Sequence, residues 1–112
     1  MIREFVYTRK FDRKWIKLGL NDDDLYSLEL FLLENPESGR IMEGTGGIRK
    51  MRWAFPDKGK SGGIRVLYVD FIISEKICMF DLFPKDEKDN LSQSEKKALK
   101  QIVKAIGEEF RR

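Results

Sequence analysis

Histidine is absent from the 112-residue sequence, and cysteine occurs only once, as Cys78. Without histidine there can be no Ser-His-Asp triad, no Cys-His pair and no histidine-ligated zinc. Acid–base chemistry would therefore depend on carboxylates, lysines, tyrosines or the thiol. A single cysteine also excludes a disulfide within the chain, and its place in an apolar run favours a buried side chain over a nucleophile. We accordingly expect neither a metal centre nor a cofactor.

Long apolar runs are missing as well. No stretch approaches the ~20 residues of a membrane helix, and the first residues, MIREFVYTRKF, lack the apolar core of a secretory signal. We therefore expect a cytoplasmic protein with no membrane contact. The length and a hydrophobic fraction of 41% fit a single domain over residues 1–112 with one core.

Capping residues and helical spacing predict three helices. Thr8 is placed to cap a helix over 9–17, and Asn21 to cap a second helix that ends before Pro36. The sequence Ser-Gln-Ser-Glu at 92–95 matches a capping box, which would begin a helix that continues to the C-terminus. Each of these helices carries apolar residues at a spacing that would bury one face.

Apolar runs predict four strands, over 3–7, 48–55, 64–73 and 76–83. The strand over 64–73 is apolar on both faces, so we place it in the centre of the sheet, and 36–47 is expected to be a loop. The predicted fold class is α+β, in the order strand–helix–helix–strand–strand–strand–helix. Two N-terminal helices would pack on a mostly antiparallel four-stranded sheet, with a further helix at the C-terminus.

Positive charge is concentrated in one part of the chain. Residues 44–68 carry six basic residues and one acid, Asp57, although the whole chain has a net charge of only +3. Residues 22–43 are acidic instead, and Arg40 is their one basic residue. Such a basic stretch is what a site for a nucleic-acid backbone needs.

The basic stretch reads as two strands joined by a glycine-rich loop. Alternation would place Lys50 and Arg52 on one face of the first strand, with Arg65 on the neighbouring strand. Lys58 and Lys60 would lie in the connecting loop. This array suits phosphate groups. The alternative from charge alone is a solvated hairpin that serves only solubility.

Three segments carry a resemblance to a known family: GTGGIRKMRWA, GKSGGIRVLY and FPKDEKDNLSQSEKKALKQIVK. Together they resemble the RelE/HigB group of bacterial toxins from type II toxin–antitoxin pairs, in the RelE/ParE superfamily. The match runs from about 44 to 104, and the HigB side of the group is the closer likeness. The resemblance implies a RelE-like fold and an endoribonuclease that cuts mRNA in the ribosomal A site.

The resemblance also implies roles for single residues. Lys50 and Arg52 match the family's paired basic residues, Arg65 its phosphate-stabilising arginine and Lys85 its basic position after the last strand. In this chain Leu91 stands where RelE has a C-terminal tyrosine. The implied reaction is metal-independent attack of the RNA 2′-hydroxyl on the adjacent phosphorus. Lys50 would be the base, Arg65 the charge stabiliser, and Lys85 or Arg52 the proton donor or second stabiliser.

A second group of residues is expected to contact the RNA around the cleaved bond. These are Arg49, Lys58, Lys60, Tyr68, Phe83 and Lys88. For Phe83, a ring packed in the core is the alternative to base stacking.

The family likeness further implies mRNA and the ribosome as partners, together with a cognate antitoxin, a DNA-binding helix-turn-helix protein like HigA. Two other readings of the function stay open at this point. One is a non-catalytic ParE-like toxin that inhibits DNA gyrase, and the other is an inactive RNA-binding relative.

Overall fold

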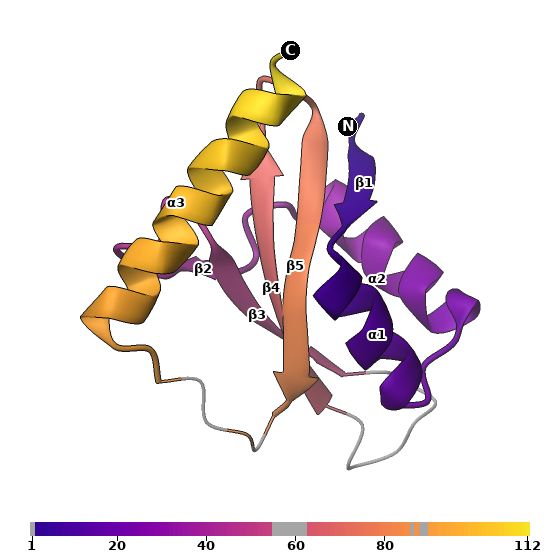
Figure 1. The fold of residues 1–112 in the computed structure, drawn as a ribbon. Helices are drawn as coiled ribbons and strands as arrows, with labels where there is room; N and C mark the ends of the chain where they lie inside the picture. The colour runs from indigo at the N-terminus through magenta and orange to yellow at the C-terminus, as the bar shows by residue number, and fades with distance from the viewer. Residues whose placement is uncertain (1, 55–62, 86, 88–89) are drawn as a thin grey trace.

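The computed structural model describes residues 2–54, 63–85, 87 and 90–112. Five strands form one sheet in the order β1-β5-β4-β3-β2 (Figure 1). Their bounds are β1 Glu4–Tyr7, β2 Arg40–Ile41, β3 Arg49–Ala54, β4 Gly63–Phe71 and β5 Lys76–Pro84. β1 runs parallel to β5, and every other neighbouring pair is antiparallel.

Three helices begin where the capping residues predict. They are α1 Arg9–Lys17, α2 Asp22–Glu34 and α3 Gln93–Phe110. The Thr8 hydroxyl accepts a hydrogen bond from the Phe11 N–H at 3.1 Å. Asn21 and Ser92 each form a reciprocal capping box with the residue three positions on. Satisfied N–H groups at each start explain why local sequence sets these boundaries. None of the described helices is long and apolar enough to span a membrane.

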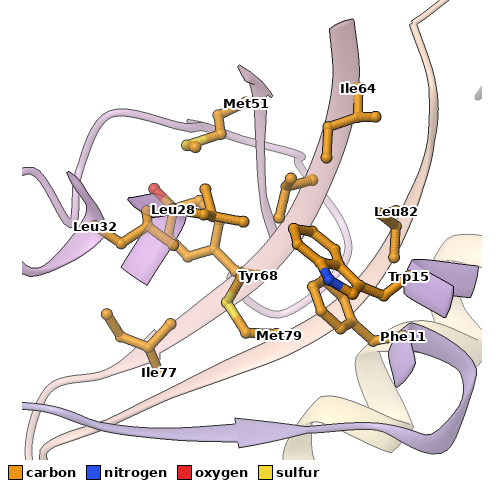
Figure 2. Packing of buried hydrophobic residues seen from close by; sticks show 11 residues of the cluster. Phe11, Trp15, Leu28, Leu32, Met51, Ile64, Tyr68, Ile77, Met79 and Leu82 are labelled. Carbon is orange, nitrogen blue, oxygen red and sulfur yellow. The ribbon is translucent and has the colours of Figure 1, made fainter. Parts of the chain in front are cut away.

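The sheet separates two apolar clusters. α1 and α2 lie on one side of it and α3 on the other (Figure 1). The first cluster gathers side chains from α1, α2 and the three central strands, with Phe11, Leu28 and Tyr68 fully buried in it (Figure 2). The second cluster lies on the α3 side of the sheet, where Val103 of α3 packs with buried strand residues such as Leu67. Each strand residue therefore points either to the α1/α2 side or to the α3 side.

The predicted α+β class is confirmed, as is the central place of the strand that starts at Gly63. The strand count is one higher than expected, because Arg40–Ile41 forms the short strand β2 within the predicted loop. Two residues are too few to show a period, so the sequence pattern contains no sign of this strand.

Candidate functional site

The alternation of β3 divides its residues between the two sides of the sheet. Met51 and Trp53 belong to the cluster on the α1/α2 side. Lys50 and Arg52 occupy the positions between them and therefore point to the α3 side. The same strand thus anchors the core with one set of side chains and presents cations with the other.

Pairing with β4 brings a third cation to this array. Arg52 lies directly opposite Arg65 in the antiparallel register. Side chains at opposed positions leave the same face of the sheet, with Cβ atoms ~4.5–5.5 Å apart. The structure therefore places Lys50, Arg52 and Arg65 on one face, as the alternation indicates.

A fourth cation comes from the edge of the sheet. Arg40 of β2 lies opposite Lys50. A hollow of about 360 Å³, which we call the arginine hollow, lies among these side chains. It is lined by Arg40, Lys50, Met51, Arg52 and Arg65. Four of these five described lining residues carry a positive charge, and such a cluster attracts anions.

Lys85 lies on the same face but outside the arginine hollow. It follows β5, and its backbone N–H donates a hydrogen bond to the Gly63 carbonyl at 3.3 Å. A Cβ atom at Gly63 would be 2.9 Å from Cδ of Lys85. The lysine stem therefore packs directly over the backbone of β4 at Gly63, in space that a side chain would otherwise fill. Gly63 is two residues from Arg65 on the same side of β4. Glycine at this position therefore lets the lysine stem lie next to the arginine.

The position of the Tyr68 side chain contradicts the prediction that it contacts RNA. Its side chain is 0% exposed on the α1/α2 side of the sheet. The hydroxyl donates to the Pro36 carbonyl at 2.8 Å and accepts from the Gly39 N–H at 2.9 Å. Tyr68 therefore holds the loop before β2 against the core.

The side chains of Arg49 and Phe83 also lie where the predicted contact with RNA is not possible at this site. Arg49 points to the α1/α2 side, where Nη1 donates to the Gly39 carbonyl at 2.7 Å and stabilises the same loop as Tyr68. Phe83 is only 7% exposed and packs in the cluster beneath α3, as the alternative reading held. Lys58, Lys60 and Lys88 lie outside the described residues.

Two functional candidates were missed from sequence. Arg40 completes the arginine hollow, and Lys96 of α3 lines a second hollow beside it. The signal for Arg40 was its position as the one basic residue in the acidic stretch 22–43. Lys96 gave no comparable signal, because it is one of several lysines on a charged helix.

The other groups with possible chemical roles, the Cys78 thiol and the carboxylates, do not form a second site in the described part of the chain. Cys78 is 1% exposed, as predicted, and burial raises the pKa of its thiol to about 11. Among the described residues, no group of three or more Cys, Asp or Glu side chains could hold a metal ion. The cation-lined face is therefore the candidate site, on a small α+β domain whose two helical layers leave part of one sheet face open.

Comparison with known proteins agrees with this class. A family model described as "RelE toxin of RelE / RelB toxin-antitoxin system" matches residues 4–109. The chain therefore belongs to the RelE toxin family, and a cognate antitoxin is the partner that this family implies.

A solved structure shares the fold. It is the E. coli toxin RelE in the free state, as a variant with two arginines changed to alanine. The match has 16% identity and a TM-score of 0.56, and it covers 77% of this chain and 86% of that chain. At this identity the likeness concerns the fold.

Proposed function

We propose that this toxin is a metal-independent endoribonuclease that cuts mRNA on the translating ribosome. The observation that carries the proposal is the opposed pair Arg52 and Arg65, which lines the arginine hollow together with Arg40 and Lys50. A phosphodiester is the anion that such a face suits, since arginine binds phosphate oxygens through two parallel N–H groups.

The reaction follows from the substrate's own chemistry. The RNA 2′-oxygen forms a bond to the adjacent phosphorus, and the bond from phosphorus to the 5′-oxygen breaks. The products are a 2′,3′-cyclic phosphate and a free 5′-hydroxyl. One base must take the 2′-hydroxyl proton, one acid must protonate the leaving oxygen, and cations must stabilise the charge that develops on the phosphorane.

The residues of the face divide these tasks by their chemistry. Arginine stays charged in proteins, so Arg65 and Arg52 serve as charge stabilisers. Lys50, which lines the arginine hollow together with these arginines, is the base. Lys85 is the proton donor, because its stem over Gly63 directs it to the Arg65 end of the site.

Ribosome dependence fits the shape of the site. The arginine hollow lies on a sheet face, and one hollow of about 360 Å³ does not surround an RNA strand. Proximity and orientation contribute much of the barrier reduction in such reactions. A surface that already holds mRNA in an extended path would supply the orientation, so activity on free RNA is expected to be weak.

The antitoxin is expected to be a DNA-binding helix-turn-helix protein like HigA. Acidic segments of such a partner would neutralise the cations of the arginine hollow and exclude RNA by charge complementarity. This part of the proposal rests on the family likeness and on the sign of the face.

Primer extension on cellular mRNA after induction tests the proposal. Wild-type protein should produce discrete cuts near codon boundaries, and Arg65→Ala should abolish both the cuts and growth arrest. Lys97→Ala, which removes a cation from an exposed position of α3 away from the described lining of the hollows, is the matched control and should cut like wild type. Folded Arg65→Ala protein with an unchanged cleavage pattern would overturn the mechanism. Intact mRNA with DNA-damage signalling after wild-type induction would instead favour a ParE-like gyrase inhibitor.

A further inference from the structure

A second hollow lies beside the arginine hollow and is lined in part by α3. It has a volume of about 470 Å³, within the range of pockets that hold small ligands. We call it the flanking hollow, and its lining consists of Arg40, Ile41, Met42, Lys50, Asn90, Leu91 and Lys96. Arg40 and Lys50 line both hollows, so the two hollows lie side by side.

The flanking hollow differs in chemistry from the arginine hollow. Ile41, Met42 and Leu91 give it an apolar wall, and the Ile41 side chain is 49% exposed. Asn90 adds an amide that can both donate and accept hydrogen bonds. An apolar surface beside an amide and cations suits a nucleotide, whose base has an apolar face and polar edges.

The position of Lys96 is fixed by its surroundings. Its stem lies against Gly44, where an added Cβ would be 3.6 Å from the lysine Cδ. Gly44 has a φ of +83°, a conformation that favours glycine and keeps the loop after β2 close to α3. The capping box of Ser92 and Glu95 sets the start of α3 at Gln93, three residues before Lys96. Lys96 therefore lines the flanking hollow from α3, whereas Arg40 lines it from β2.

We propose that the flanking hollow binds the nucleotide next to the cleaved bond. Its base lies on Ile41, Met42 and Leu91, and its phosphate lies between Arg40 and Lys96. The Asn90 amide reads the base edge, so this hollow sets the sequence preference of cleavage. The inference rests on the proposed function, because it assigns a neighbouring subsite to the same RNA strand.

The test uses Lys96→Gln, which keeps the stem that packs on Gly44 and removes the charge. Lys97→Gln, one position along the same helix, is the matched control. The probe is an RNA trinucleotide with a 2′-O-methyl group at the scissile position, which cannot be cut. Lys96→Gln should weaken its binding several-fold, and the slope of log K against log salt should become shallower by ~0.7 because one phosphate contact is lost.

Cleavage in cells gives a second readout. Transcriptome-wide mapping of RNA ends should show that Ile41→Ala still cuts mRNA but with an altered nucleotide preference beside the cut. A merely structural role of Ile41 would lower all cuts together. If Lys96→Gln and Lys97→Gln bind with equal affinity and slope, and Ile41→Ala keeps the wild-type preference, the subsite is wrong while the nuclease stands. If the wild type cuts no RNA and does not bind the trinucleotide, both proposals fail.

Discussion

Arg52 of β3 and Arg65 of β4 occupy directly opposed positions in the antiparallel register. Like charges at directly opposed positions lower stability, by the same ~0.2–1 kcal/mol that favourable cross-strand pairs contribute. A phosphate bound between the two side chains would offset this repulsion. Sites that trade stability for function in this way are common in enzymes.

Replacing one member of this pair should stabilise the toxin and inactivate it. Arg52→Gln removes the repulsion, so the midpoint of thermal unfolding should rise by roughly 1–5 °C at low salt. The gain should shrink at high salt because salt screens exposed charges, and mRNA cleavage should be lost. Lys97→Gln, with the same change in net charge, should show no such gain. A lower midpoint for Arg52→Gln would contradict the repulsion, and one that stays raised in 1 M salt would contradict its electrostatic origin.

Tyr68 should matter for stability and not for contact with RNA. Tyr68→Phe removes the buried hydroxyl and leaves the Gly39 N–H and the Pro36 carbonyl without this partner. Unfolding in urea should show a loss of about 1–3 kcal/mol. The cut positions on mRNA should stay those of the wild type, because the ring lies on the far side of the sheet.

The control for this variant is Tyr26→Phe. Its ring is 62% exposed on α2, so loss of the hydroxyl should change the free energy of unfolding by less than ~0.5 kcal/mol. Equal stability of the two variants would show that the Tyr68 hydrogen bonds contribute nothing measurable. Changed cut positions for folded Tyr68→Phe would return this residue to the RNA site.

Sequence reasoning located those features that depend on neighbouring residues. The caps Thr8 and Ser92 could be predicted because a side chain satisfies an N–H three residues away. The shared face of Lys50 and Arg52 followed from alternation. Alternation along β4 places Tyr68 on the face of the sheet that points away from the Arg65 side chain. The sequence pattern itself therefore argues against a contact between Tyr68 and RNA at this site.

The rest of the site depends on contacts between distant segments. Arg52 lies opposite Arg65 because of the register in which β3 and β4 pair. Alternation along each strand fixes which face a residue points to, but a shift of the pairing by two residues would keep the same faces and change the partners. Arg40 enters the site through a strand of two residues, too short to show a period. Lys96 comes close to Gly44 because α3 packs across the sheet, a contact between segments about fifty residues apart.

An ion pair between Arg3 and Asp70 supports the sheet far from the site. Nε of Arg3 donates to Asp70 Oδ1 at 2.7 Å and Nη2 donates to Oδ2 at 3.3 Å, so the segment before β1 is tied to the central strand β4. The two side chains are only 9% and 7% exposed. Arg3→Met should cost about 3–5 kcal/mol, because the carboxylate remains nearly buried without its partner.

Two further variants separate the pair from general charge effects. Arg3→Met combined with Asp70→Leu should recover most of the lost stability, because no buried charge is left. Lys76→Met breaks the pair with Glu4, whose side chain is 68% exposed, and should cost less than ~1 kcal/mol. A double variant as unstable as Arg3→Met would show that the arginine acts through packing of its stem.

The buried thiol gives the protein a predictable weakness at alkaline pH. Burial raises the pKa of Cys78 from its ordinary 9.0 to about 11. Between these values the unfolded chain releases the thiol proton while the folded chain retains it, so stability is full below pH 9 and falls as the pH rises. Urea unfolding should show that wild type loses about 1 kcal/mol more than Cys78→Ala between pH 8 and pH 10. The comparison cancels the titration of lysines and tyrosines, and parallel losses in the two proteins would contradict a raised pKa in the folded state.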